Sequence, residues 1–313
     1  MNRLNYRFAF WHLLVNRIMG HIWEAEHEVD PDLALLLIQD QFPELNAKKI
    51  QLLGVGWDNT AYLIDGVYVF RFPRREIALA LLEAEAEVLP KIASVLLLEV
   101  PQPEWMGKPG GGYPWPFSGY RKLSGKTACH FDLSDEERAG MAEPLAVFLS
   151  KLHSLPLPKN IQTDPLDRLN PEKLIAKIDH NLEELALLGL MGDVKRLYRE
   201  GEYPIPKEGI LVHGDLYVRH LLLDESRKLT GVIDWGDVHS GDPAVDLAIA
   251  HSFLPGSAHE NFCNAYGRVE KDTWRLARLR ALYHSSTLML YGHHSGDEAI
   301  IRECLRSIET LSI

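Results

Sequence analysis

The chain has 313 residues, of which 46% are hydrophobic and 25% are charged, and its formal net charge is −11. These proportions are typical of folded globular proteins and exclude a disordered or fibrous chain. The negative charge argues against nucleic acid or an anionic membrane as the main partner, because both require a basic protein surface.

The N-terminal residues and the cysteines bear on location. Cys129, Cys263 and Cys304 are far apart and form no CxxC pair, which favours reduced thiols in a cytoplasmic protein. No apolar run reaches the ~18 residues of a membrane span, so we expect no membrane partner. Residues 1–24 lack the apolar core and cleavage site of a secretory signal. We interpret them as an N-terminal extension, either an appended amphipathic segment or a start assigned upstream of Met19.

The first predicted elements are one helix and three strands. Asp30 followed by Pro31 is typical of a helix N-cap and first turn, and it predicts a helix over "DLALLLIQDQF". Strands are predicted over "KIQLLGVGWDN", "TAYLI" and "VYVFRF". The dipeptide Asp65-Gly66 between the last two indicates a tight hairpin, so the three strands form an antiparallel meander.

The remaining elements separate a β-rich half from a helical half. "REIALALLEAEAEVLPKIA" predicts a helix that Pro90 ends, and "SVLLLEV" predicts a strand after it. Beyond the Gly/Pro-rich residues 107–116 and "FSGYRKLSG", helices are predicted over "DEERAGMAEPLAVFLSKLHSL", "PEKLIAKIDHNLEELALLGL" and "DTWRLARLRALYHSSTLML". Residues 210–250 interrupt them with strands "ILV", "HLLLD" and "LTGVIDW" and the helix "PAVDLAIAHSFL". The fold class is therefore α+β, with an N-lobe of residues 25–119 and a helical C-lobe of residues 120–313.

Polar side chains gather between two apolar stretches in "HGDLYVRH", residues 213–220. If "HLLLD" and "TGVID" pair as a hairpin around "ESRK", then His220 and Asp234 lie side by side with Asp215 near them. Asp234 lies between Ile233 and Trp235, so we expect its carboxylate to be buried against a cation. One carboxylate that orients a hydroxyl, beside groups that hold Mg²⁺, is the arrangement that phosphoryl transfer requires.

The motifs "HGDLYVRHLLLD", "GVIDW" and "GDPAVDLA" together resemble the signature of the aminoglycoside phosphotransferases and their relatives. The resemblance runs from about Gly54 to Leu247 and implies a bilobal protein-kinase-like fold. Most of that family has Asn at the place of His220. The macrolide 2′-phosphotransferase branch is similar to this chain in having His there and in its strand resembling "RFPRR". The resemblance implies transfer of the γ-phosphate of ATP or GTP to a hydroxyl of a small molecule, an antibiotic of macrolide or aminoglycoside type.

The resemblance also implies roles for residues of the C-lobe. Asp215 is expected to be the catalytic base, with His220 and Asp234 as ligands of Mg²⁺. Because imidazole suits softer ions than Mg²⁺, Mn²⁺ is a second candidate metal, and the alternative is that His220 only packs and hydrogen-bonds at the base of the loop. His213 is expected to support the loop backbone. Asp242 and Asp246 are expected to brace turns.

The nucleotide-binding residues are expected in and after the meander. Val69 and Arg71 are two residues apart and so share one face of a strand; by the resemblance, one contacts the base and the other the phosphates. The carboxylate partner of Arg71 is expected to be Glu85 on the following helix. The hinge that reads the nucleotide base through its backbone is expected at Arg121, Lys122 and Leu123.

Two other functions remain open from the sequence. A metal-dependent hydrolase would use a two-ion cluster of His213, Asp215, His220, Asp234 and His239. A catalytically silent, nucleotide-binding pseudokinase would explain why the usual Lys and Asn are absent. The acceptor is equally open, since the seven acids and seven bases from Ile249 onward do not form an evident polycation site. Aromatic residues there either line an apolar pocket suited to a macrolide or form core: Phe253, Phe262, Tyr266, Trp274, Tyr283 and Tyr291.

Overall fold

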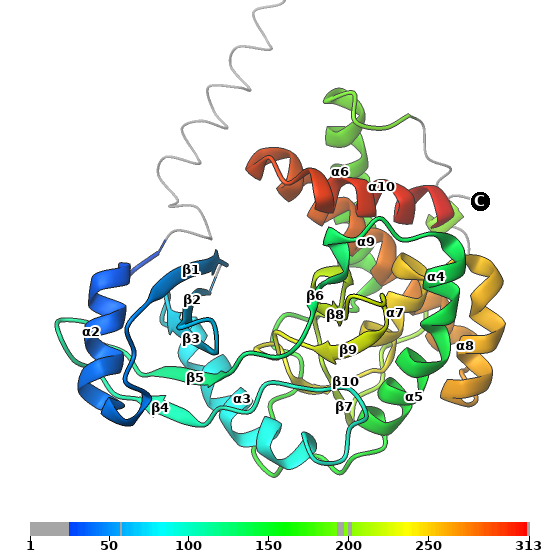
Figure 1. The fold of residues 1–313 in the computed structure, drawn as a ribbon. Coiled ribbons are helices and arrows are strands. Elements are labelled where there is room, and N and C mark those ends of the chain that lie inside the picture. The colour runs from blue at the N-terminus through cyan, green and yellow to red at the C-terminus, as the bar shows by residue number, and fades with distance from the viewer. Residues whose placement is uncertain (1–24, 57, 193–196, 200–201, 312–313) are drawn as a thin grey trace, which may run out of the picture. The chain divides into compact units, whose positions relative to one another are not determined.

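A computed structural model describes residues 25–56, 58–192, 197–199 and 202–311. The chain divides into two units, Met1–Glu83 with Pro103–Lys122 and Ala84–Gln102 with Leu123–Ile313. The first unit contains an antiparallel sheet and the second is mostly helical (Figure 1), which confirms the α+β fold class. The lobe limits 25–119 and 120–313 stay predictions, and the predicted extension 1–24 lies outside the described residues.

The sheet of the first unit has five strands in the order β1-β2-β3-β5-β4. The predicted meander is present, and the turn between β2 and β3 has positive φ angles of 51° at Asp65 and 75° at Gly66, as a type I′ hairpin requires. β5 then pairs with β3 and with β4. The strands are β1 Ile50–Val55, β2 Asn59–Ile64, β3 Tyr68–Pro73, β4 Trp105–Gly107 and β5 Phe117–Arg121.

Helix α2 (Pro31–Gln41) and aromatic side chains form the core of this unit. Asp30 caps the helix as predicted, since its side chain accepts a hydrogen bond from the Leu33 amide at 2.8 Å. The rings of Phe72 and Phe117 stack with centroids 4.5 Å apart. A Cβ added at Gly119 would lie 2.3 Å from the Phe70 ring, so the packing of this core requires glycine in β5.

Two predictions around helix α3 (Ile77–Ile92) are wrong. Pro90 does not end the helix, which continues to Ile92, because a proline near the C-terminal end removes only one helical hydrogen bond. The segment "SVLLLEV" does not form a strand. Among its residues, Glu99 alone forms an isolated β-bridge, with Gly231. The apolar alternation that suggested a strand reflects side-chain burial, and the segment pairs with a neighbouring strand only through Glu99.

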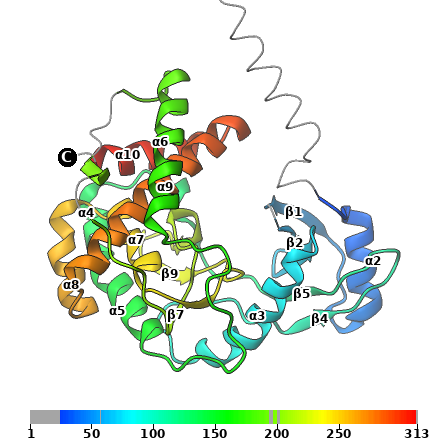
Figure 2. The ribbon, with the colours of Figure 1, turned by 180° about the vertical axis from the view of Figure 1, so that it is seen from behind.

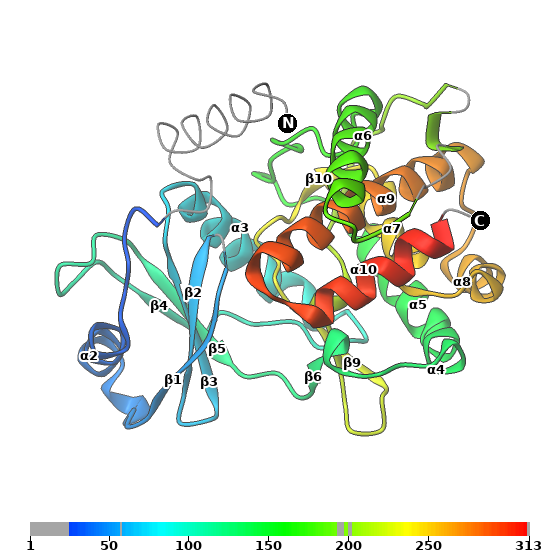
Figure 3. The same ribbon diagram turned by 90° about the horizontal axis from the view of Figure 1, so that it is seen from above.

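The long helix α9 (Lys271–Ser295) packs against α6, α7 and α10 in the second unit (Figures 2 and 3). One helix was predicted over "DEERAGMAEPLAVFLSKLHSL", but two are found, because Pro144 cannot donate a hydrogen bond to the turn before it. In the described part of the chain, no helix combines the length and apolar character that a membrane span requires. The other helices are α4 Asp135–Gly140, α5 Ala142–His153, α6 Pro171–Leu187, α7 Ala244–Phe253, α8 His259–Tyr266 and α10 Glu298–Leu311.

Short helical turns complete the described chain: η1 Pro43–Leu45, η2 Ala128–His130, η3 Leu197–Arg199, η4 Val218–His220 and η5 Gly256–Ala258.

Two small sheets carry the polar motif of the second unit. The predicted hairpin is confirmed, since β8 (Leu221–Leu223) pairs antiparallel with β9 (Leu229–Val232), and β6 (Lys126–Thr127) pairs with β8 on its other side. The second sheet pairs β7 (Ile210–Val212) with β10 (His239–Gly241). The loop that contains "HGDLY" therefore starts at the end of β7 and returns through η4 into β8.

Candidate active site

The loop after β7 depends on a glycine. Gly214 has a φ of +88°, and a Cβ added to it would lie 2.2 Å from the Asp237 carbonyl oxygen. Only glycine accepts both the left-handed backbone and this close approach. The chain can therefore turn sharply between His213 and Asp215, next to the segment that follows Asp234.

His213 connects the two sides of this turn, as expected for a residue that supports the loop. Its Nε2 lies 3.0 Å from the carbonyl oxygen of Ile233, to which it donates, and its Nδ1 accepts a hydrogen bond from the Asp215 amide at 3.3 Å. Full burial lowers the pKa of this imidazole. His213 is therefore neutral, with both nitrogens engaged, and it has no role left in proton transfer.

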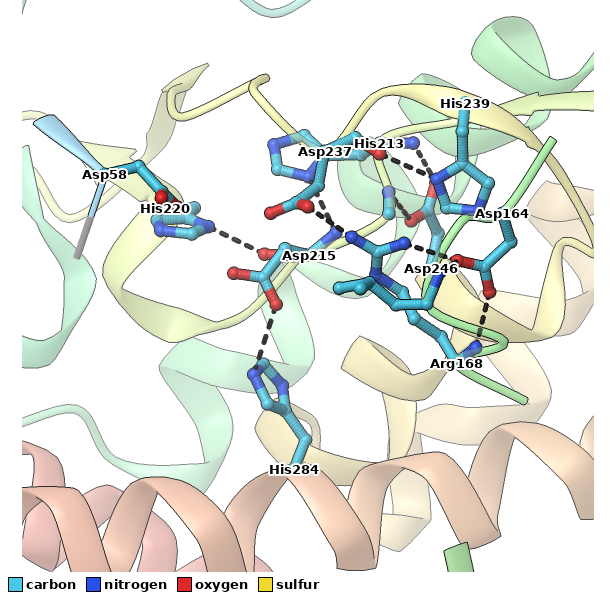
Figure 4. Close-up of polar contacts among 12 residues, drawn as sticks. Asp58, Asp164, Arg168, His213, Asp215, His220, Asp237, His239, Asp246 and His284 are labelled. Atoms are coloured by element: carbon cyan, nitrogen blue, oxygen red, sulfur yellow. Dashed lines mark hydrogen bonds and ion pairs between the residues drawn. The ribbon is translucent and has the colours of Figure 1, made fainter. Parts of the chain in front are cut away.

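Asp246, at the start of α7, holds the same loop from beneath (Figure 4). Its carboxylate accepts hydrogen bonds from the amides of His213 at 2.7 Å and Gly214 at 2.9 Å, and it lies 3.1 Å from His153 Nε2. Burial alone would raise the pKa of Asp246, but the hydrogen bonds and the nearby histidines lower it by more. The expected bracing role of Asp246 is present in the structure.

Asp215 presents a carboxylate that is 30% exposed and has two basic neighbours on α9. One of its oxygens, Oδ1, lies 3.3 Å from His284 Nε2 and 3.8 Å from Arg280 Nη2. Burial alone would raise the pKa of Asp215, but contact with His284 and the charge of Arg280 lower it by more. The carboxylate is therefore ionised at neutral pH and can accept a hydrogen bond from a hydroxyl.

His220 and Asp234 lie side by side, as the hairpin predicted. His220 Nδ1 lies 2.7 Å from the Asp215 carbonyl oxygen and must donate to it, while Nε2 lies 3.3 Å from Asp234 Oδ2. Burial lowers the pKa of His220, but the hydrogen bond and charge of Asp234 raise it by more. The buried imidazole thus contacts the backbone of the Asp215 loop with one nitrogen and the carboxylate of Asp234 with the other.

The expectation that Asp234 is buried is wrong, since its side chain is 49% exposed. The backbone at Asp234 has a φ of +64°, a left-handed conformation that Asp tolerates better than most residues. This turn keeps Trp235 fully buried, with its Nε1 donating to the Val232 carbonyl at 3.0 Å, and leaves the carboxylate accessible. A strained backbone of this kind is common at functional sites.

His220 and Asp234 together could supply part of the coordination shell of a divalent cation, with other ligands supplying the rest. Because His220 Nδ1 donates to a carbonyl, Nε2 is the nitrogen that would bind a metal, and it would first have to lose the proton that it donates to Asp234 at 3.3 Å. Within the described residues, no cluster of three or more His, Cys, Asp or Glu could hold a metal. Two protein donors are sufficient for an ion such as Mg²⁺, which keeps waters and takes phosphate oxygens as further ligands.

A second acidic residue of the "DWGD" motif is structural in character. Asp237 forms an ion pair with Arg168, which also pairs with Asp164 (Figure 4). The carbonyl of Asp237 accepts a hydrogen bond from His239 Nδ1 at 2.6 Å. Since no group of three or more His, Cys, Asp or Glu side chains among the described residues could hold a metal ion, the two-ion hydrolase cluster has no support in the geometry.

The predicted nucleotide-binding residues belong mainly to the first unit. Val69 is buried in β3, and Arg71 follows it on the same face of the strand. Glu85 is buried on α3 in the second unit, and its pairing with Arg71 stays a prediction. The three predicted hinge residues belong to different units. Arg121 is the last residue of β5, and its Nε lies 3.3 Å from Glu104 Oε1, whereas Leu123 starts a segment of the second unit.

One backbone group of the predicted hinge is already used. The Lys122 amide donates to the Val67 carbonyl at 2.7 Å. A nucleotide base would therefore have to be read by other amides and carbonyls of residues 121–123.

The sequence reasoning missed Arg280 and His284, which lie close to the Asp215 carboxylate. The two residues are four apart and so lie on one face of α9, which is the one signal that the sequence offers. No local spacing connects α9 to the loop that contains Asp215.

Comparison with known proteins agrees with this geometry. The model of a family described as the phosphotransferase enzyme family matches residues 49–282. The chain belongs to this family. The family resemblance and the expectation of a phosphotransferase enzyme are thereby confirmed.

The similar proteins include phosphotransferases named for aminoglycosides and one named for macrolides. The aminoglycoside 3′-phosphotransferase of Streptomyces ribosidificus is 29% identical over 157 residues, which are 46% of this chain and 59% of that protein. The GDP complex of an aminoglycoside 2′-phosphotransferase-IIIa is 25% identical, with a TM-score of 0.64 over 91% of this chain and 99% of the other. A macrolide 2′-phosphotransferase type I is 20% identical, with a TM-score of 0.57 over 92% and 99% of the two chains. These likenesses confirm the kinase-like fold.

Proposed function

We propose that this chain transfers the γ-phosphoryl group of ATP or GTP to a hydroxyl of a small molecule. The observation that carries the proposal is the Asp215 carboxylate, ionised and accessible, next to the paired His220 and Asp234. The relatives named above suggest an antibiotic acceptor of the macrolide or aminoglycoside type.

In this reaction Asp215 accepts a hydrogen bond from the acceptor hydroxyl and orients its oxygen toward the γ-phosphorus. The new P–O bond forms as the bond to the bridging oxygen breaks, the nucleoside diphosphate leaves with the electron pair, and Asp215 takes the proton late. His220 and Asp234 would hold Mg²⁺ or Mn²⁺, which supplies positive charge to the phosphate oxygens when bound. Val69, Arg71, Glu85 and the segment of Arg121, Lys122 and Leu123 are the proposed nucleotide-binding residues.

The test is a turnover assay with purified protein. ATP and GTP are each combined with a panel of macrolides, aminoglycosides and simple alcohols, and both the nucleoside diphosphate and the phosphorylated product are measured. Stoichiometric formation of both supports the proposal. Nucleotide binding without turnover on any acceptor would instead favour the pseudokinase, and phosphoester cleavage without nucleotide would favour the hydrolase.

A further inference from the structure

A buried guanidinium next to the proposed base is unexplained by the fold. The Arg280 side chain is 7% exposed, and its Nη2 lies 3.8 Å from Asp215 Oδ1, which is too long for a hydrogen bond. Among the described residues we find no hydrogen bond to its nitrogens, although a guanidinium has five N–H donors. Burying a cation with so few partners is costly unless something else binds it.

The Arg280 nitrogens remain accessible despite the burial of the residue. In the described part of the chain, no fully enclosed side-chain nitrogen or oxygen lacks a hydrogen-bond partner. Since the Arg280 nitrogens lack such partners, none of them is fully enclosed, and Nη2 lies 3.8 Å from the carboxylate proposed to orient the acceptor.

The positive charge extends away from Asp215 over an aromatic ring. The Arg280 guanidinium lies 5.2 Å from the centroid of the Tyr283 ring, and the Lys177 ammonium of α6 lies 5.3 Å from the same centroid. Arg168, a second arginine near Asp215, is already paired with the two carboxylates of Asp164 and Asp237. Within the described chain, Arg280 and Lys177 share no such carboxylate pair, and among these groups the Arg280 guanidinium is the cation next to Asp215.

Arg280 and Lys177 lie on the side of Asp215 where the acceptor is proposed to bind. Figure 4 shows His284, on α9, and His220, on the loop, approaching Asp215 from different directions. The His220 side carries Asp234 and hence the proposed ion and phosphates. Arg280 is on α9 one turn before His284, and it contacts the carboxylate oxygen that His284 contacts.

We propose that the acceptor carries an anionic group, a carboxylate or a phosphate, which Arg280 binds while a hydroxyl of the same molecule faces Asp215. This inference rests on the proposed phosphoryl transfer but departs from the antibiotic acceptor that the relatives suggest, since macrolides and aminoglycosides carry amines. The hydroxyl and the anionic group lie about one to three carbon atoms apart, given hydrogen bonds of ordinary length to both residues. A polycationic aminoglycoside is the wrong charge for this site, whatever the relatives act on.

The experiment uses matched hydroxy compounds that differ in one charge. One set is glucuronate, glucose and 6-amino-6-deoxyglucose, with glucose 6-phosphate added; the second is glycerate, glycerol and 3-aminopropane-1,2-diol. Dissociation constants are measured by calorimetry with the full chain and a non-hydrolysable ATP analogue. We expect the anionic members to bind at least about 10-fold more tightly than the neutral ones, with the ammonium members weakest.

Variants on α9 separate the site from a general charge effect. Arg280→Met should erase the preference for anions, Arg280→Lys should retain part of it, and Arg275→Met, whose guanidinium instead contacts the Glu202 carbonyl and the Tyr203 ring, should leave it unchanged. Equal binding of the three charge types, no binding, or a preference that survives in Arg280→Met would overturn the inference. The higher affinity of glucose 6-phosphate or of the carboxylates then tells which anion the site takes.

Failure of the inference can be told from failure of the proposed function. If an aminoglycoside is phosphorylated equally by the wild type and by Arg280→Met, phosphoryl transfer stands and the anionic acceptor is wrong. If anions bind in an Arg280-dependent way but no acceptor consumes nucleotide, the binding site stands and the proposed transfer is wrong.

Discussion

Two basic side chains on one oxygen set the chemistry of Asp215. Since His284 and Arg280 favour the ionised carboxylate, its pKa lies below the usual range and it is a weak base. A weak base suits a phosphoryl transfer whose transition state is loose, because the hydroxyl there keeps its proton until late. Orientation of the hydroxyl is then the larger contribution of Asp215.

Asp215→Asn keeps the shape of the side chain but removes its charge and proton acceptor. We expect the turnover number to fall by about 10²- to 10⁴-fold, with the nucleotide dissociation constant within about twofold of wild type, since Asp215 is proposed to face the acceptor. Steady-state kinetics and fluorescent-nucleotide binding measure the two quantities. Parallel loss of both would show that Asp215 serves the nucleotide instead.

His220 differs from Asp215 in that it is buried and has both nitrogens in contact with polar groups. His220→Asn offers an amide oxygen in place of Nε2, whereas His220→Ala offers nothing. If His220 is a metal ligand, the turnover order is wild type or Asn above Ala, and Ala requires more Mg²⁺ for half-maximal rate. Kinetics over a range of Mg²⁺ and Mn²⁺ concentrations decide this, and identical metal dependence in all three proteins would assign His220 to packing.

At the scale of elements, the β7–β10 pair and the β8–β9 hairpin bring together the two ends of the motif. Leu221 is opposite Val232, and the Ile233 amide donates to the His220 carbonyl at 3.0 Å. The register thus determines that His220 and Asp234 are neighbours. Asp246 on α7 then fixes the loop through two amides.

Gly214→Ala tests how tightly these elements meet. The variant places a Cβ 2.2 Å from a backbone oxygen at a positive φ. We therefore expect the free energy of unfolding to fall by at least about 2 kcal/mol. The control is Gly140→Ala in α4, where no atom lies within 4 Å of the added Cβ and alanine favours the helix. Urea unfolding compares the two, and an equal change in both variants would contradict the predicted clash.

Features that depend on short-range structure could be predicted from the spacing of residues in the sequence. The hairpin around "ESRK" is a short-range element, so the adjacency of His220 and Asp234 followed from the sequence. The apolar period of "SVLLLEV" correctly indicated burial of Leu96, Leu98 and Val100 but could not show that most of the segment lacks a pairing partner.

The rest of the site depends on tertiary packing. Arg280 and His284 are brought to Asp215 only because α9 packs beside α6 and α7, and no motif in the sequence encodes that placement. The exposure of Asp234 was missed for another reason: its neighbours Ile233 and Trp235 are apolar, but the left-handed turn at Asp234 is a backbone property that flanking residues do not reveal.

For the whole molecule, the proposed roles divide between the two units, with nucleotide contacts mainly in the first and the acceptor hydroxyl in the second. Arg71, in β3 of the first unit, and Asp215, in the second, are therefore expected to affect different kinetic constants. A variant of each unit separates the two functions.

Arg71→Ala should raise the KM for nucleotide about 10-fold or more, through loss of a charge-assisted contact with a phosphate, and should leave the KM for the acceptor unchanged. Lys108→Ala, an exposed basic residue of the same unit, is the control. Initial rates with each substrate varied in turn give both constants. A nucleotide KM equal to that of the control would place Arg71 outside the nucleotide site.

The bonds to Asp246 have a consequence for hydrogen exchange. The amides of His213 and Gly214 belong to a loop, yet each donates to a carboxylate with no exposed surface. Their hydrogens can exchange with solvent only when α7 separates from the loop, so in deuterated buffer they should exchange as slowly as those of the core helices. The segment that presents the reactive carboxylate would then be among the last parts of this protein to open.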